Sequence, residues 1–91
     1  MNSKKAPNDD LITVLSVINE KSEMRALLED LFTVSEIRDA SQRLRVARLL
    51  TEEKSYIEIE ELTGSSATTI ARVSKCLSAG SGGYLRALEE F

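Results

Sequence analysis

The sequence predicts an all-α protein of about six helices, with a helix-turn-helix in its C-terminal half. Apolar residues recur every three or four positions along most of the chain, which is the period of an amphipathic helix. Capping residues and glycines stand where these periodic segments begin and end. Aromatic residues make up only 4% of the 91 residues, and tryptophan is absent. The core must therefore consist mainly of aliphatic side chains, as packed helices favour.

The first third of the chain predicts a flexible tail over residues 1–7 and two apolar helices. Asn8 is a good N-cap residue, and Asp9 and Asp10 place negative charge in a first helical turn. A break is expected near residues 19–22. The apolar positions are Leu11, Ile12, Leu15 and Ile18 in the first helix, and Met24, Leu27, Leu28 and Leu31 in the second. A hairpin of this size cannot bury all of them, so a partner surface is expected.

A long third helix should begin at Thr33. Thr33 and Glu36 form the T-x-x-E pattern of a capping box, in which each residue satisfies a backbone amide of the other. The helix is expected to reach about residue 50, followed by a charged connection at residues 52–54. It carries the arginines Arg43, Arg45 and Arg48.

A short fourth helix, residues 56–63, is predicted by a second capping box at Ser55 and Glu58. Gly64 should end it, because glycine readily adopts the positive φ that closes a helix. Ser65 and Ser66 are candidate N-caps for a fifth helix that extends to about residue 77.

The end of the chain predicts a flexible connection at Gly80, Gly82 and Gly83, followed by a last helix over residues 84–91. We treat residues 1–91 as one domain, in which residues 8–54 form dimerisation helices and residues 55–77 form the helix-turn-helix.

The fifth helix is expected to read DNA. Ile59, Ile70 and Val73 have the spacing that holds two helices across a turn. Four small or polar residues then face outward and could meet base edges and thymine methyl groups in the major groove. These residues are Ala67, Thr68, Thr69 and Ala71. Further along the helix, Arg72 and Lys75 could reach phosphates.

The charge is unevenly distributed. The net charge of the chain is −3, which is unusual for a protein that binds DNA. Residues 38–50 carry four basic groups and one acidic group, for a net +3, whereas residues 51–61 carry one basic and five acidic groups, for a net −4. A basic face can therefore exist on an acidic protein.

The composition argues against several classes of protein. Histidine is absent, which removes the commonest general base and metal ligand, so we predict that the protein is not an enzyme. The single Cys76 cannot form an intramolecular disulfide and is expected to be a small buried residue. No apolar run approaches the length that spans a membrane, and the N-terminus lacks a signal peptide. We expect a cytoplasmic protein without a membrane partner.

The run ELTGSSATTIARV at residues 61–73 resembles the reading region of the Trp repressor family. LFT at residues 31–33 and RLR at residues 43–45 match as well, and the resemblance covers roughly residues 27–91. Within the family, the chain is most similar to the Trp-repressor-like proteins of Gram-positive bacteria (the YerC/YecD group). The resemblance implies an intertwined homodimer of six-helix chains.

The resemblance also implies which residues contact DNA. They are Tyr56, Ile57 and Glu60 in the first helix of the motif, and Ala67, Thr68, Thr69 and Ala71 in the second. Glu60 departs from the family pattern, since a basic residue stands at that position in the Trp repressor.

In the Trp repressor, tryptophan lies between two arginines that match Arg43 and Arg72, against a wall that includes the match of Thr33. Guanidinium planes can stack on an aromatic ring. However, Val73 and Cys76 replace a glycine and a serine of that ligand site. We therefore predict that this chain has no cofactor and does not need tryptophan.

The functional prediction is a sequence-specific DNA-binding transcriptional regulator, a repressor, that binds a symmetric DNA site. The alternative is a protein-interaction module built on the same helix-turn-helix scaffold, which the acidic residues would suit. Salt dependence of binding to duplex DNA separates the two, since counterion release weakens DNA binding as salt rises.

Overall fold

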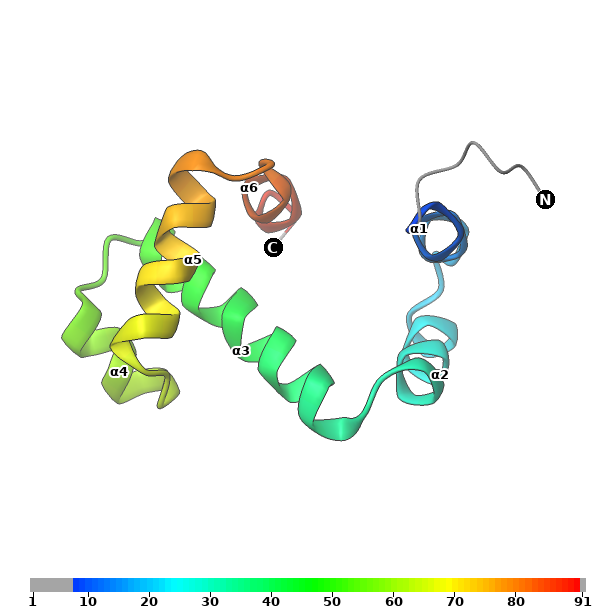
Figure 1. Ribbon diagram of the computed structural model, residues 1–91, viewed down its shortest axis with the longest axis horizontal. Coiled ribbons are helices and arrows are strands. Elements are labelled where there is room, and N and C mark those ends of the chain that lie inside the picture. Colours follow the sequence, from blue (N-terminus) through cyan, green and yellow to red (C-terminus); the bar gives the residue numbers. More distant parts are fainter. Residues whose placement is uncertain (1–7, 91) are drawn as a thin grey trace. The chain divides into compact units, whose positions relative to one another are not determined.

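The computed structural model describes residues 8–90, so the predicted tail at residues 1–7 lies outside the described part. Within residues 8–90 the chain forms six α-helices and no strand, which confirms the predicted fold class (Figure 1). The helices are α1 (Asp9–Val17), α2 (Lys21–Leu31), α3 (Val34–Thr51), α4 (Tyr56–Thr63), α5 (Ala67–Ala79) and α6 (Gly83–Leu88). None of them is long and apolar enough to cross a membrane.

The chain divides into two units, residues 1–37 and 38–91. In the first unit, the predicted cap of α1 makes no side-chain bond, and α2 has a cap that was not predicted. Asn8 makes no side-chain capping bond to α1. Glu20 instead caps α2, because its carboxylate accepts hydrogen bonds from the backbone amides of Ser22 and Glu23, both at 3.3 Å. Sequence reasoning missed Glu20, since glutamate is not among the residues preferred at this position.

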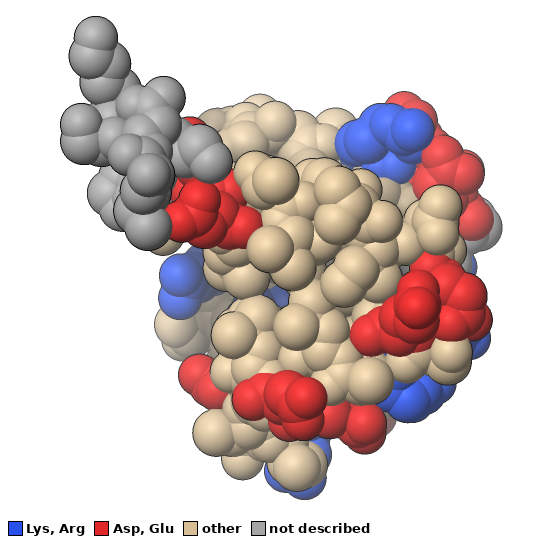
Figure 2. Space-filling view, turned by 90° about the vertical axis from the view of Figure 1, so that its right-hand side faces the viewer, with Lys and Arg blue, Asp and Glu red and all other residues tan. Residues whose placement is uncertain are grey.

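Within residues 8–37, many large apolar side chains are exposed to solvent. Neither α1 nor α2 contains a buried residue. Figure 2 shows a face of the molecule on which uncharged side chains gather, with acidic and basic side chains around them. The exposed large apolar residues of α1 are Leu11, Ile12, Val14 and Val17. Residues 8–37 therefore have no closed core within the single chain.

Helix α3 has a well-defined hydrogen-bonded structure at each end. The amide of Thr33 donates to the Glu36 carboxylate at 2.9 Å, and the amide of Glu36 donates to Thr33 Oγ1 at 3.1 Å, which confirms the predicted capping box. At the other end, the amide of Lys54 donates to the Leu49 carbonyl, and that of Glu53 donates to the Leu50 carbonyl. This is the Schellman pattern, which places Glu53 in the left-handed conformation with φ 63°.

The second unit contains the hydrophobic core. Its five buried apolar residues come from three helices: Val46 and Ala47 from α3, Ile59 from α4, and Ile70 and Val73 from α5. Half-buried residues from α3, α5 and α6 pack around them, namely Leu49, Leu50, Leu77, Tyr84 and Leu88. The core thus fixes α4 and α5 against the C-terminal half of α3 (Figure 1).

Helix α6 is shorter than the predicted 84–91. It ends at Leu88, after which the amides of Glu89 and Glu90 donate to carbonyls three residues earlier, at 3.3 and 3.2 Å. These are turn bonds, and helix ends often tighten in this way because their last carbonyls lack partners. Arg86 forms ion pairs with both carboxylates across this turn. Phe91 lies outside the described residues.

Candidate nucleic-acid interface

Helices α4 and α5 and the turn between them form the predicted helix-turn-helix. Helix α4 occupies residues 56–63, as expected, and Ser55 Oγ accepts from the amide of Glu58 at 3.1 Å. Gly64 follows with φ 74°, which a residue with a side chain adopts only at a cost. Ser66 Oγ then caps α5 by accepting from the amide of Thr69 at 3.2 Å. The local sequence therefore determines both helix ends that face the turn.

Three buried residues hold the two helices of the motif in one arrangement. Ile59 and Ile70 are fully buried, and Val73 is 1% exposed. These are the three positions that the sequence pattern assigned to the inside of the motif. Because close-packed side chains interlock, the exposed face of α5 is presented on a rigid base.

The exposed face of α5 carries most of the predicted DNA-reading residues. Ala67, Thr68 and Ala71 are exposed, and Thr69 is half-buried. Arg72 and Lys75 are also exposed and form no ion pair within residues 8–90. Small and polar groups thus precede two unpaired cations along one helix. The small and polar groups suit contacts with base edges, and the cations suit contacts with phosphates.

The exposed face of α4 has a different character. Tyr56 and Ile57 are exposed, whereas Glu60 is half-buried. The Glu58 carboxylate lies 3.3 Å from the hydroxyl of Ser55, from which it accepts a hydrogen bond. Carboxylates repel phosphate, so α4 offers DNA two uncharged side chains and an unfavourable charge.

A hydrogen bond from α3 reaches the last residue of α4, where the turn begins. Gln42 Nε2 donates to the carbonyl of Thr63 at 2.5 Å. The Thr63 hydroxyl donates to the carbonyl of Ile59 at 2.7 Å and accepts from the amide of Ser65 at 3.1 Å. Sequence reasoning missed Gln42. The only available signal was its position four residues before Val46, which places the two residues on one face of a helix.

The hydroxyl of Ser65 is buried in the turn and has no hydrogen-bond partner among residues 8–90, although the residue is 7% exposed. The sequence offered Ser65 and Ser66 as alternative caps for α5, and Ser66 performs that role.

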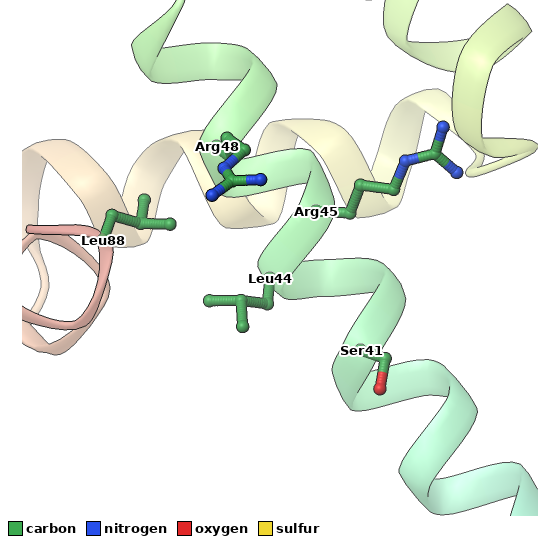
Figure 3. Close-up of a pocket in the computed structure, with 5 residues that line it drawn as sticks. All are labelled: Ser41, Leu44, Arg45, Arg48 and Leu88. Atoms are coloured by element: carbon green, nitrogen blue, oxygen red, sulfur yellow. The ribbon is translucent and has the colours of Figure 1, made fainter. Parts of the chain in front are cut away.

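The arginines of α3 do not form a single patch. A pocket of about 210 Å³ lies between α3 and α6 and is lined by Ser41, Leu44, Arg45, Arg48 and Leu88. Figure 3 shows Leu44 and Arg48 turned toward the same space as Leu88, while the Arg45 guanidinium leaves α3 on the other side. The net positive charge of residues 38–50 is therefore spread around the helix.

The residues that match the tryptophan site have separate environments. The Thr33 side chain is part of the capping box of α3. Arg43 and Arg72 are exposed and form no ion pair within residues 8–90. The side chain of Val73 is buried in the core cluster of the second unit.

The expectation that Cys76 is buried is wrong for the single chain, in which the residue is exposed. Cys76 faces the connection between α5 and α6 and lines an open pocket with residues 80–84. Glycine occupies positions 80, 82 and 83 of this segment, and glycine has no side chain with which to cover the thiol.

Comparisons with known proteins agree with this arrangement. Residues 7–91 match the model of the Trp repressor protein family. The chain is 40% identical over 81 residues to the uncharacterised protein YerC of Bacillus subtilis (strain 168), a match that spans 89% of this chain and 78% of YerC.

Two solved structures are similar throughout. A TrpR-like protein from Eubacterium eligens ATCC 27750 has a TM-score of 0.88 and 36% identity, over 96% of this chain and 90% of its own. A protein from Staphylococcus aureus, provisionally named a Trp repressor, has a TM-score of 0.87 and 33% identity, over 96% of this chain and 87% of its own. The chain therefore belongs to the Trp repressor family, whose members are helix-turn-helix DNA-binding regulators and not enzymes.

Proposed function

We propose that this protein is a homodimeric, sequence-specific repressor of transcription that acts in the cytoplasm and reads a two-fold symmetric DNA site through α5. The observation that carries the proposal is the exposed first half of α5, held on the buried residues Ile59, Ile70 and Val73. A reading helix must be both accessible and rigid, because base edges are distinguished by hydrogen bonds of narrow geometry.

The residues of α5 that were predicted to meet DNA have chemistry that suits this proposal. The Thr68 hydroxyl can donate to or accept from a base edge, and the methyl groups of Ala67 and Ala71 can contact thymine methyls. Arg72 and Lys75 supply phosphate contacts, which give affinity and position the helix without reading sequence. Thr69 contributes mainly by holding the start of the helix, since its amide is bonded to Ser66.

The dimer in the proposal is supported by the apolar side chains that the first unit leaves exposed. Ile12 and Val17 in α1 are 57% and 72% exposed. Isolated apolar residues at a surface are ordinary, but a whole helix face of them usually marks an interface. A second copy of the chain would cover this face and would place two reading helices on a symmetric site. Repression would follow from occupancy of that site.

One feature favours the alternative, in which the helix-turn-helix binds another protein. Helix α4 presents exposed Ile57 and Leu62 next to the carboxylates of Glu58 and Glu61. Apolar side chains surrounded by charged ones are typical of a protein interface.

Selection of bound sites from random duplex DNA tests the proposal. We expect enrichment of a palindromic sequence whose affinity falls steeply as salt is raised, because counterions are released on binding. Enrichment of a non-palindromic site would contradict the symmetric dimer. Failure to enrich any sequence, together with salt-independent capture of a protein partner, would support the alternative.

A further inference from the structure

The amide of Gln42 connects α3 to the turn of the helix-turn-helix. Its Nε2 donates to the carbonyl of Thr63, the last residue of α4, at a part-buried position. The same nitrogen lies 4.0 Å from the point where a Cβ on Gly64 would stand, in ordinary van der Waals contact with that point. The contact thus lies at the point where the chain leaves α4 for α5.

The Gln42 hydrogen bond restrains the orientation of the turn relative to α3, which the apolar core does less strictly. Val46 and Ala47 pack α3 against Ile59, Ile70 and Val73, but hydrophobic contact is non-directional and tolerates small rotations and slides. A hydrogen bond at 2.5 Å weakens steeply when its angle or distance changes. Gln42 lies one helical turn before Val46, on the same side of α3. Its hydrogen bond therefore extends the contact that Val46 and Ala47 make with the helix-turn-helix.

The anchored residue is linked in turn to the start of α5. The Thr63 hydroxyl accepts from the amide of Ser65, and Ser66 caps α5 through the amide of Thr69. These two hydrogen bonds therefore connect Thr63, whose carbonyl is held by Gln42, to the first residues of the reading helix. A shift of the Thr63 carbonyl relative to α3 would move Ala67 and Thr68 together.

We propose that Gln42 is a positioning residue for DNA recognition: by anchoring the Thr63 carbonyl to α3, it sets the orientation in which α5 meets the major groove. The inference rests on the proposed function and adds a residue that does not itself contact DNA. Base contacts need correct orientation, whereas phosphate contacts through flexible Arg and Lys side chains tolerate reorientation. Loss of the Gln42 bond should therefore reduce sequence discrimination much more than it reduces general DNA affinity.

The test compares Gln42→Met with Ser41→Ala. Methionine keeps the approximate length of glutamine but lacks the amide group whose Nε2 donates to Thr63, and Ser41 is an exposed neighbour on α3. We expect the affinity of Gln42→Met for the selected site to fall about tenfold, and its affinity for unrelated duplex to change by less than about twofold. Ser41→Ala should behave like the parent protein. Equal losses on both DNAs, or unchanged discrimination, would overturn the proposal.

A second variant provides a rescue. In Gln42→Glu the carboxylate faces the Thr63 carbonyl and cannot donate, but a protonated carboxyl can. Discrimination should be poor near neutral pH and should recover relative to the parent as pH is lowered toward the ordinary pKa of a glutamate carboxyl, about 4.3. A purely structural role would give no such selective recovery. Discrimination that stays at its neutral-pH level throughout would count against the hydrogen bond.

Amide hydrogen exchange provides a readout without DNA. We expect faster exchange at Ser65 and at the first amides of α5 in Gln42→Met, with the amides of α6 unchanged. If the parent protein binds no duplex, the proposed function fails, but exchange still decides whether Gln42 holds the turn. Exchange identical to that of the parent would refute the anchoring.

Discussion

Two hydrogen bonds join Ser66 and Thr69 at the start of α5: Ser66 Oγ accepts from the Thr69 backbone amide at 3.2 Å and donates to the Thr69 hydroxyl at 3.1 Å. Thr69 is also half-buried, whereas Thr68 is exposed. The two threonines therefore have different roles, although the sequence pattern assigned both of them to base reading.

Separate substitutions of the two threonines should give different results. Thr68→Ala is expected to weaken binding to the selected site by roughly 1–3 kcal/mol, the cost of a lost base contact, with unchanged thermal stability. Thr69→Ala keeps the backbone amide that caps the helix, so it should affect binding less. Binding titrations and thermal unfolding of each variant check this. A Thr68→Ala variant that binds as tightly as the parent would exclude Thr68 as a reader.

The exposed apolar face of α1 predicts a dimer in solution. Sedimentation at micromolar concentration should give twice the mass of one chain. Leu11→Glu places a charge on the apolar side of α1 and should lower the sedimenting mass or unfold the protein, since dimer and core are then one structure. Thr13→Glu adds the same charge on the polar side of the helix and should leave the mass unchanged. A stable, folded monomer of the parent chain would contradict the dimer.

Tryptophan should not be required for DNA binding. Val73 stands where the Trp repressor family has a glycine in its ligand site, and here the side chain is buried in the core. Calorimetric titration of the purified protein with tryptophan should show no saturable heat. Val73→Gly would open the space, but it should cost roughly 2–4 kcal/mol of stability, because it removes core packing as well as helix propensity. A tight tryptophan complex of the parent would restore Arg43, Arg72 and Thr33 as an effector site.

Replacement of Glu53 by glycine should stabilise the protein. Glu53 closes the C-terminal end of α3 with φ 63°, a conformation that residues with a Cβ adopt at a cost of about 1 kcal/mol. Glycine at this position should therefore raise the free energy of unfolding by up to about 1 kcal/mol, measured by urea denaturation. Glu52→Gly, one residue earlier where φ is not positive, is the matched control and should destabilise the protein. Destabilisation by Glu53→Gly would mean that the Glu53 side chain makes a compensating contribution.

The capping box of α3 predicts a local pH dependence. The amide and hydroxyl of Thr33 hold the pKa of Glu36 below its ordinary value, with the amide as the larger cause. Because the folded pKa lies below the unfolded one, the carboxylate stabilises the fold above the unfolded pKa, and this stabilisation is lost as pH falls through the folded pKa. In an NMR titration the Glu36 carboxyl should titrate at lower pH than the same carboxyl in Thr33→Val, which lacks the hydroxyl. If Glu36 titrates at the same pH in the parent and in Thr33→Val, the Thr33 hydroxyl does not lower the pKa of Glu36.

The sequence alone determined the local features of this protein. The capping box at Thr33 and Glu36, the cap at Ser55 and the left-handed turn at Gly64 all depend on residues within four positions of one another. Helix periodicity likewise indicated that Ile59, Ile70 and Val73 face inward. Such features are set by backbone geometry and by short-range hydrogen bonds, which a linear sequence specifies directly.

The tertiary structure decided which side chains meet across helices. Gln42 and Thr63 are 21 positions apart, so only the crossing of α3 with the helix-turn-helix brings the donor to its acceptor. The exposure of Cys76 and the different directions of Arg45 and Arg48 likewise depend on which element covers each face. Periodicity can assign a residue to a side of its own helix, but the partner on that side is fixed only when the helices pack.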